Sequence, residues 1–264
     1  MTDQGLSIQN LMVRFGGHTA VNDLTMHAPV GKITGLIGPN GAGKTTTFNV
    51  CSGAVKPTGG TVTFEGTDLV HAPSSKRAHL GIGRTFQRIE LYDSLTVREN
   101  VSLGREARLA GTSPITQLIP RRGERAACAE ATASALAACG IEDIADARAG
   151  LLSTGQRRLI ELARALAGDF RLLLLDEPSS GLDVSESENF IAILHDVVDR
   201  LGVGILIVEH DMTVISELCD YAYVLDFGVL IYEGTPHEVL SSAEVRTAYL
   251  GSEAIPGIDE EVVA

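Results

Sequence analysis

The chain has 264 residues, of which 44% are hydrophobic, and this is enough for one large domain or for a core domain with an inserted subdomain. Its 21 basic and 34 acidic residues give a formal net charge of -13, which argues against general nucleic-acid binding because an acidic surface repels phosphates. The four cysteines form no C-x-x-C pair, and the first ten residues lack the features of a secretory signal. No apolar run reaches the roughly 20 residues of a membrane span, so we expect a cytosolic chain.

The first part of the chain alternates short strands with one helix. Hydrophobic patterning predicts strands over residues 6–15, 23–29, 32–38 and 60–69, and a helix that begins at Lys44. Between about residues 88 and 168 the pattern becomes helical. One helix starts in "TVREN" (96–100) and another in "GERAACAEATASALAAC" (123–139), joined by "GTSPITQLIP" (111–120).

The last part of the chain alternates apolar strands with helices. The predicted elements are a strand in "RLLLLDEP" (171–178), a helix over 185–201, a strand over 204–210, a helix over 212–219 and a hairpin over 221–234 that turns at Phe227–Gly228. Continuous apolar runs separated by helices indicate a parallel sheet covered on both faces, and therefore an α/β fold. We predict one domain over residues 1–250, in which a helical insert (about 88–168) separates core segments at about 1–87 and 169–250. The acidic residues 251–264 are expected to form a loose tail.

The segment "GPNGAGKTT" (38–46) matches the pattern G-x-x-x-x-G-K-[ST] between a predicted strand and a predicted helix. Its three glycines allow a tight loop whose amide groups point at phosphate oxygens, and the helix N-terminus adds a partial positive charge. Lys44 can reach the β- and γ-phosphates, and the hydroxyl of Thr45 is suited to Mg²⁺. The pattern predicts a nucleoside-triphosphate site, although kinases, GTPases and motor proteins all use it. The predicted nucleotide contacts are Gly38, Pro39, Asn40, Gly41, Ala42, Gly43, Lys44, Thr45 and Thr46.

Two adjacent carboxylates follow the apolar strand at residues 172–175. Asp176 emerges at the carboxyl edge of that strand, where sheets of this kind bind ligands, and its carboxylate suits Mg²⁺ through a bound water or another ligand of the ion. Glu177 can polarise an attacking water, and the alternative for this pair is a solvated turn. His210 ends the next core strand and can stabilise the charge that develops on the γ-phosphate, the alternative being a structural histidine.

Together these segments resemble the ATP-binding subunits of ABC transporters, and the resemblance covers nearly the full chain. The matching motifs are Walker A at 38–46, the Q-loop "RTFQ" at 84–87, the signature "LSTGQ" at 152–156, Walker B in "LLLLDEP" at 172–178, the D-loop "SSGLD" at 179–183 and the switch histidine in "EHD" at 209–211. The signature is the most specific of these motifs, because other P-loop families lack it. The resemblance implies a P-loop ATPase core with an N-terminal antiparallel β-subdomain and an inserted α-helical subdomain.

The resemblance also implies that two subunits share ATP. In this family the Walker A loop of one subunit and the signature of its partner hold each nucleotide in a head-to-tail dimer. Ser153 and Gly155 would contact the γ-phosphate bound by the partner, and the helix beginning near Gln156 would direct its dipole at that phosphate. These three residues and Asp183 of the D-loop are therefore predicted nucleotide contacts. Thr154 replaces the glycine common at its position, and its Cβ is expected to restrict the backbone there.

Two further positions take their roles from the resemblance. Phe15, in "VRFGG", matches the aromatic residue that stacks on adenine, with a core aromatic at a strand end as the alternative. Gln87 would reach Mg²⁺ or the attacking water through its side-chain amide. The predicted metal ligands are Thr45, Gln87 and Asp176. The predicted catalytic residues are Glu177, His210, Lys44 and Gln87.

Several segments resemble one branch of the family, the importers of hydrophobic and branched-chain amino acids, and within it the first of their two ATPase subunits. The segments are "RFGGHTAVND", "IGPNGAGKTTTFNV", "GRTFQ", the proline-containing loop before "RRGERA", and "VRTAYLGSE". Lipopolysaccharide-export ATPases and urea or other amide importers share this ATPase type and are the alternatives.

The branch implies several partners at the inner face of the cell membrane. They are a second ATPase subunit, identical or paralogous, transmembrane permease subunits and, indirectly, a solute-binding protein. Residues 88–100 would form the groove that receives a helix of a membrane subunit. Leu91, Tyr92 and Leu95 either line that groove or belong to the core of the helical insert.

Three functions of other classes are also considered. A soluble ABC-type ATPase acting on ribosomes or DNA would carry a second nucleotide domain or long coiled coils, and this sequence has neither. A P-loop kinase would place its acid beside a pocket for a second substrate, and no such pocket is evident in the sequence. A regulatory subunit that only binds nucleotide is disfavoured by the presence of both Glu177 and His210.

Overall fold

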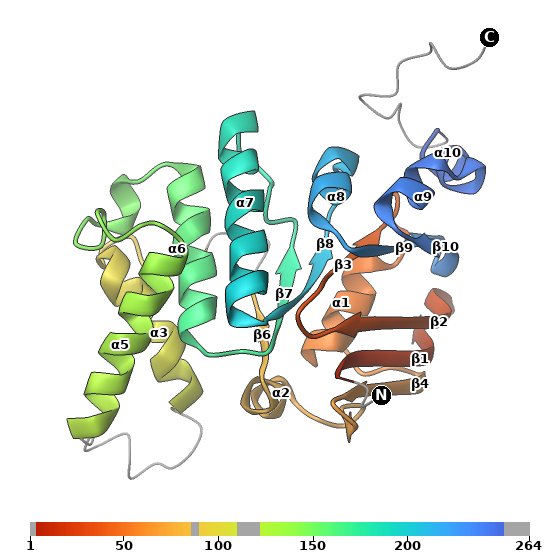
Figure 1. Cartoon of the computed structure of the whole chain (residues 1–264). Coiled ribbons are helices and arrows are strands. Elements are labelled where there is room, and N and C mark those ends of the chain that lie inside the picture. Colours follow the sequence, from red (N-terminus) through yellow and green to blue (C-terminus); the bar gives the residue numbers. More distant parts are fainter. Residues whose placement is uncertain (1–3, 86–89, 110–121, 251–264) are drawn as a thin grey trace.

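A computed structural model of the chain describes residues 4–85, 90–109 and 122–250 (Figure 1). Its strands form two sheets, one in the order β2-β1-β4-β5 and one in the order β10-β9-β3-β8-β7-β6. The strands are β1 (Gly5–Phe15), β2 (His18–Pro29), β3 (Ile33–Ile37), β4 (Gly59–Phe64), β5 (Thr67–Asp68), β6 (Ile82–Arg84), β7 (Leu172–Asp176), β8 (Gly204–Val208), β9 (Tyr221–Asp226) and β10 (Val229–Gly234). The helices are α1 (Lys44–Ser52), α2 (Ser74–Leu80), α3 (Val97–Leu109), α5 (Arg122–Ala138), α6 (Thr154–Ala167), α7 (Val184–Leu201), α8 (Met212–Leu218), α9 (Pro236–Ser241) and α10 (Ala243–Leu250), with a 3-10 turn at Ala149–Leu151. Within the described ranges, no helix is both long enough and apolar enough to cross a bilayer.

The six-stranded sheet lies at the centre of the molecule. Strands β6, β7, β8, β3 and β9 run parallel, and every residue of β3, β7 and β8 is buried. Because side chains alternate across a sheet, Leu173 and Leu175 join one hydrophobic cluster, whereas Leu172 and Leu174 join another. The first cluster includes residues of α7, α8 and the helical insert, and the second includes residues of α1 and the four-stranded sheet. The predicted parallel sheet with two covered faces is confirmed.

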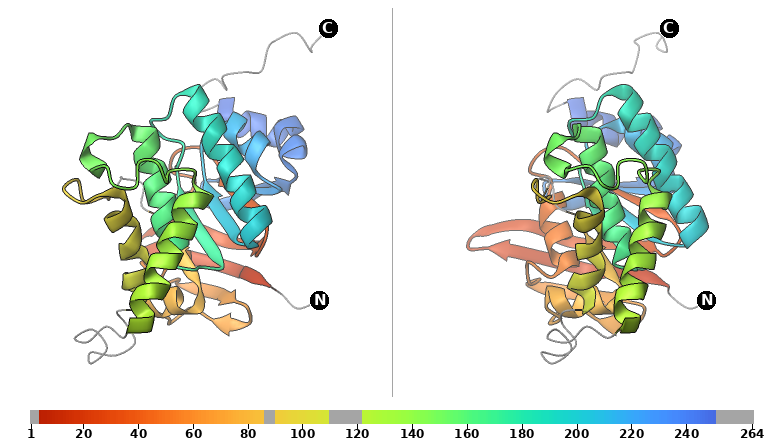
Figure 2. Two further views of the ribbon diagram at one scale, coloured as in Figure 1. Left: turned by 60° about the vertical axis from the view of Figure 1, so that its left-hand side comes forward. Right: turned by 90° about the vertical axis from the view of Figure 1, so that its left-hand side faces the viewer.

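Helices α3, α5 and α6 pack against one another at the β6–β7 end of the molecule (Figure 2). Their buried residues Val101, Leu136 and Ile160 belong to the same hydrophobic cluster as Ile207 of the central sheet. The helices therefore share a core with the sheet rather than forming a separate one. Both helices predicted between residues 96 and 139 are present, as α3 and α5. The connecting segment 111–120 lies outside the described residues.

Some predicted boundaries differ from the structure. The single strand predicted over residues 60–69 is wrong, because Glu65 and Gly66 have φ values of 50° and 77° and turn the chain between β4 and β5. Strand β2 begins at His18 rather than at residue 23, because it pairs with β1 up to the tight turn that joins them. Strand β6 and helices α2, α9 and α10 are not predicted, since each is too short to show a clear hydrophobic period.

One buried arginine caps the C-terminal end of α1. Arg77 of α2 is 2% exposed and donates to four backbone oxygens: Nη1 to Val50 and Cys51, Nη2 to Leu69, and Nε to Ala72. The first two oxygens belong to the last turn of α1, where helix carbonyl groups lack partners within the helix. The positive guanidinium also opposes the negative end of the helix dipole. Arg77 therefore fixes the helix that follows the predicted phosphate loop.

We expect Arg77→Met to lower the free energy of unfolding by about 3 kcal/mol, because methionine fills the space but removes the Arg77 donors from the carbonyl oxygens of Cys51 and Ala72, whereas those of Val50 and Leu69 keep a backbone donor. The control is Arg98→Met, which removes only an exposed ion pair with Asp146 and is expected to change stability little. Urea unfolding of the two full-length variants measures both changes. Equal losses would contradict the role given to Arg77.

Candidate nucleotide-binding site

The loop between β3 and α1 requires glycine at two positions. Gly38 has φ +147° and Gly43 has φ +100°, backbone conformations that other residues rarely adopt. A Cβ at Gly38 would collide with the carbonyl oxygen of Leu225, and one at Gly43 would lie 2.6 Å from that of Ala20. The loop is therefore pressed against neighbouring backbone, and α1 begins directly after it. This joins a tight glycine loop to a helix N-terminus, the arrangement that binds phosphate groups.

Lys44 is buried beside this loop. It is 6% exposed, and its Nζ donates to the carbonyl oxygens of Gly38 at 2.5 Å and Pro39 at 2.9 Å. Burial lowers the pKa of Lys44, and the negative charges of Glu177 and Asp176 act in the opposite direction. The amine therefore lies within electrostatic reach of both predicted site carboxylates.

Asp176 closes β7 at the carboxyl edge of the sheet and is 4% exposed. Burial raises the pKa of its carboxyl group, and the nearby Arg84 of β6 opposes this rise, with Nη2 3.5 Å from Oδ2. Arg84 also donates to Asn49 Oδ1 and Ser52 Oγ of α1, and it stacks 4.8 Å above the ring centre of Phe48. It thus links β7 with α1. The sequence gives Arg84 no role, and its place at the start of "RTFQ" is the only signal for it.

Glu177 and His210 meet at the same edge of the sheet. Strands β7 and β8 are parallel with Asp176 opposite Val208, so the residues that follow them are neighbours. Glu177 has φ 46°, a strained conformation of the kind found at functional sites, and its N–H donates to Val208 O at 2.8 Å. Its Oε1 lies 3.9 Å from Nδ1 of the exposed His210. The structure therefore brings these two predicted catalytic residues together.

The signature residues form the N-terminal cap of α6. Ser153 Oγ accepts from the N–H of Gln156, whose side chain accepts from the Ser153 N–H, and this forms a capping box. Ser153 Oγ also donates to Glu186 Oε1 at 3.3 Å, and a Cβ on Gly155 would collide with the same carboxylate. The helix begins at Thr154 and not near Gln156. Thr154 takes a helical backbone that any residue can adopt, so the predicted restriction by its Cβ is wrong.

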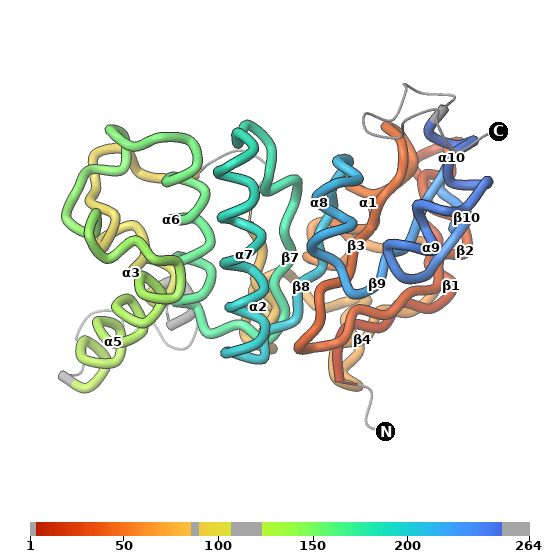
Figure 3. The backbone as a smooth tube through the Cα atoms, turned by 45° about the horizontal axis from the view of Figure 1, so that its top comes forward, coloured from red at the N-terminus to blue at the C-terminus, as the bar shows by residue number. Residues whose placement is uncertain are grey.

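The signature contacts the D-loop of its own chain. Asp183 caps α7 through a second capping box with Glu186, and a Cβ on Gly181 would lie 3.6 Å from Thr154 Cγ2. Helix α6 packs in the hydrophobic cluster on one face of the central sheet and α1 in the cluster on the other, and in Figure 3 α6 lies toward the helical insert whereas α1 lies beside β3. Ser153 and Lys44 were both predicted to contact a γ-phosphate. Within one chain they lie in separate parts of the molecule.

The remaining predicted residues fall into different environments. Phe15 is 52% exposed at the end of β1, which excludes the alternative of a core aromatic. Gln87 lies outside the described residues. Of the predicted groove residues, Leu91 packs against the main hydrophobic cluster, Leu95 is half-buried and Tyr92 is exposed. Only Tyr92 therefore presents a large accessible surface.

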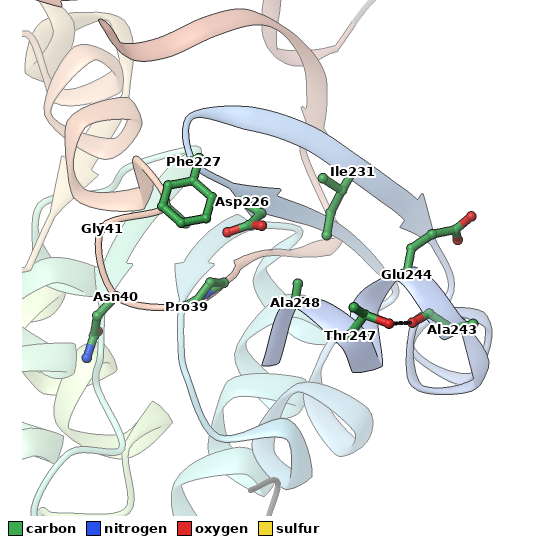
Figure 4. Close-up of a pocket in the computed structure, with 11 residues that line it drawn as sticks. Pro39, Asn40, Gly41, Asp226, Phe227, Ile231, Ala243, Glu244, Thr247 and Ala248 are labelled. Atoms are coloured by element: carbon green, nitrogen blue, oxygen red, sulfur yellow. Dashed lines mark hydrogen bonds between the residues drawn. The ribbon is translucent and has the colours of Figure 1, made fainter. Parts of the chain in front are cut away.

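A pocket of about 750 Å³ lies beside the phosphate loop (Figure 4). Residues 39–42 of the loop, Phe227 of the β9–β10 turn and residues of α10 line it, whereas Asp176 and Glu177 do not. The predicted hairpin turn at Phe227–Gly228 is confirmed, with Asp226 paired to Val229. Tyr249 of α10 is buried, which raises its pKa, and a backbone hydrogen bond at Gly38 opposes the rise. The C-terminal helix thus supports the phosphate loop from one side.

A sequence profile of the ABC transporter family matches residues 21–180, which include the glycine loop, the signature and the acidic pair. The chain therefore belongs to the ABC transporter family. Within the family it is 36% identical over 254 residues to the high-affinity branched-chain amino acid transport ATP-binding protein LivG of Salmonella typhimurium, covering 95% of this chain and 99% of LivG. It is 34% identical over 248 residues to the lipopolysaccharide export system ATP-binding protein LptB of Haemophilus influenzae, covering 94% and 98%.

Solved structures show the same fold. The ADP conformation of an ATP-binding cassette of an ABC transporter is 31% identical with a TM-score of 0.83, over 94% of this chain and 99% of that cassette. A dimeric bacterial ABC transporter cassette is 24% identical with a TM-score of 0.73, over 88% and 98%. The predicted P-loop ATPase fold is confirmed, and the chain is an ATP-binding and ATP-hydrolysing subunit of this family.

Proposed function

We propose that the chain drives an importer of branched-chain or other hydrophobic amino acids, bound to transmembrane permease subunits at the inner face of the cell membrane. The observation that supports the chemistry is the meeting of Lys44, Asp176, Glu177 and His210 around one edge of the central sheet. The similarity to LivG supports the amino-acid substrate. LptB is similar at a slightly lower identity, and no feature of the described residues favours lipopolysaccharide.

ATP is held between two subunits in this proposal. The glycine loop of one subunit binds the phosphates, and Ser153 and Gly155 of a second subunit, identical or paralogous, complete the site. Two observations support this: α6, which Ser153 caps, and α1, which follows the phosphate loop, pack on opposite faces of the sheet, and a cassette of the same fold is dimeric. The Ser153 hydroxyl, which donates to Glu186 within the chain, would donate to the γ-phosphate instead.

Hydrolysis then follows from the positions of the side chains. Glu177 accepts a proton from a water molecule while the oxygen of that water attacks the γ-phosphorus. The bond between the γ-phosphorus and the bridging oxygen of ADP then breaks. Lys44 and the loop amides offset the negative charge on the phosphates, and His210 donates to the γ-phosphate. Phe15 stacks on the adenine. Phosphate and ADP leave when the two subunits separate.

The residues at this edge fit a Mg²⁺ ion bound together with ATP. Asp176 supplies a buried carboxylate, and Thr45 supplies an exposed hydroxyl in the first turn of α1. Among the described residues, no three carboxylate, histidine or cysteine side chains cluster into a metal site. This agrees with the way Mg²⁺ is usually held beside nucleotides, by few protein ligands together with phosphate oxygens. When bound, the ion supplies positive charge that stabilises the phosphates during transfer. Gln87 is proposed as a further ligand.

The substrate is tested by purifying the chain with its membrane and solute-binding partners in proteoliposomes. We expect leucine, isoleucine and valine each to stimulate ATP hydrolysis and to accumulate inside vesicles oriented for import. Urea and lipopolysaccharide serve as competing candidates in the same assay. Stimulation by either of these, with no response to the three amino acids, would assign the chain to another branch.

A further inference from the structure

Glu209 is a fully buried carboxylate directly before His210, with 0% exposure. Its Oε1 accepts from the Ser179 N–H at 3.0 Å and from the Ser179 hydroxyl at 2.6 Å. Its Oε2 accepts from the His210 N–H at 3.3 Å. One side chain therefore ties the end of β8 to the segment that follows Glu177. The sequence gives no role to Glu209, because its contact with Ser179 depends on how β7 and β8 pair.

A carboxylate at this position is costly for the fold. Burial raises the pKa of Glu209, and the donors of Ser179 and His210 act against that rise. An apolar residue would fill the same space without this cost. Hydrophobic packing alone does not account for an acidic side chain here. The hydrogen bonds that Glu209 makes to two loops of the nucleotide site account for the acidic side chain at this position.

The imidazole of His210 lies between two carboxylates. Its Nδ1 is 3.9 Å from Glu177 Oε1 and 3.9 Å from Glu209 Oε2. The His210 side chain is exposed, and its backbone N–H is held by Glu209. Ser180 N–H donates to the carbonyl oxygen of Glu177, so the segment held by Glu209 also carries the backbone of the general base.

We propose that Glu209 is a positioning residue for ATP hydrolysis, holding His210 and the Ser179 end of the D-loop so that the imidazole stays beside Glu177. The inference rests on the proposed function, in which His210 donates to the γ-phosphate. Glu209 acts through His210 and does not itself contact the nucleotide. Its loss therefore affects the chemical step and leaves ATP binding intact.

The test is Glu209→Gln in the full-length chain. Glutamine keeps the size and can still accept from Ser179, but its amide group then faces the His210 N–H, donor against donor. We expect kcat for ATP hydrolysis to fall about 10- to 100-fold, with KM for ATP unchanged within about twofold. In a chain that already carries His210→Ala, the same substitution is expected to cause no further loss, because both changes remove one function.

The matched control is Asp220→Asn. Asp220 likewise accepts a backbone hydrogen bond, from Ile33 N–H at 2.8 Å, but it lies at the opposite edge of the sheet. This change is expected to leave kcat and KM unchanged. A second variant, Ser179→Ala, removes one donor to Glu209 while keeping the backbone N–H, and it is expected to give a smaller fall in kcat.

Several outcomes would overturn the inference. One is an unchanged kcat for ATP hydrolysis in Glu209→Gln. Another is a loss of kcat that is equally large in the unmodified chain and in the His210→Ala background. If Glu209→Gln does not fold, Ser179→Ala is used as the test. Ser179→Ala must then lower kcat in the unmodified chain and cause no further loss in the His210→Ala background. Equal hydrolysis by the unmodified chain and by Glu177→Gln would instead overturn the proposed catalytic function. The two failures are therefore distinguishable.

Discussion

Glu177→Gln is expected to lower kcat for ATP hydrolysis by about 10²–10⁴-fold while ATP still binds. Glutamine keeps the shape of the side chain at the strained position after β7, but its amide cannot take a proton from the attacking water. Lys44 and the glycine loop are unchanged, so the phosphates are still held. Because the proposed cycle separates the two subunits only after hydrolysis, an ATP-bound pair should accumulate.

Light scattering after size-exclusion chromatography with Mg-ATP measures this accumulation. Lys44→Ala serves as the control, because it removes the amine that faces both site carboxylates and should lose ATP binding together with pairing. With ADP in place of ATP, Glu177→Gln should elute as a monomer. If both variants remained monomeric in ATP, the shared-nucleotide arrangement would be refuted.

Ser153→Asp is expected to reduce ATP-dependent pairing and hydrolysis at least about 100-fold, because a negative charge facing the γ-phosphate costs several kcal/mol. Aspartate can cap a helix as serine does, but its carboxylate also meets that of Glu186 in the same chain, so urea unfolding of the free variants must first show equal stability. The matched control is Ser153→Asn, which also caps the helix but carries no charge. Pairing and hydrolysis rates of the two variants separate the effect of charge from that of shape. Equal losses would mean that Ser153 does not face a phosphate.

Mixing two inactive variants tests which chain supplies each half of the site. In a two-fold pair, a chain with Ser153→Asp supplies an intact glycine loop, and a chain with Lys44→Ala supplies an intact signature. Neither variant is expected to pair with itself, whereas a mixed pair contains one complete site of two, so hydrolysis should recover toward, and not above, about one half of the unmodified rate. A mixture as inactive as its components would show that each chain uses its own signature.

The parts of the site that the sequence predicts are those carried by local signals. The glycine loop follows from residue spacing, and its conformation confirms why Gly38 and Gly43 must be glycine. Arg84 and Glu209 lie within the motifs "RTFQ" and "EHD", but no local pattern indicates what either side chain contacts. Each acts on residues distant in the sequence, Arg84 on Asp176 through the pairing of β6 with β7 and Glu209 through that of β7 with β8. Pairing order is not encoded in any short window, so these roles appear only in the fold.

Secondary-structure elements with a strong local signal are likewise predicted, and those without one are missed. The buried strands β3, β7 and β8 consist mainly of apolar residues and are predicted from hydrophobicity. The turn at Glu65 and Gly66 is missed, because glutamate rarely takes the left-handed conformation that it has there. Helix α10 is too short for its period to stand out, although its Tyr249 helps to hold Gly38.

The order of strands in the central sheet also governs when this protein can fold during its synthesis. β3 lies between β8 and β9, so this strand waits for two partners that are synthesised more than 160 residues after it. Gly38 packs against the carbonyl oxygen of Leu225, so the glycine loop cannot close before that residue emerges. Until then both edges of an apolar strand are unpaired and prone to aggregation. A nascent chain of this protein therefore cannot form its nucleotide loop until β8 and β9 have both been synthesised.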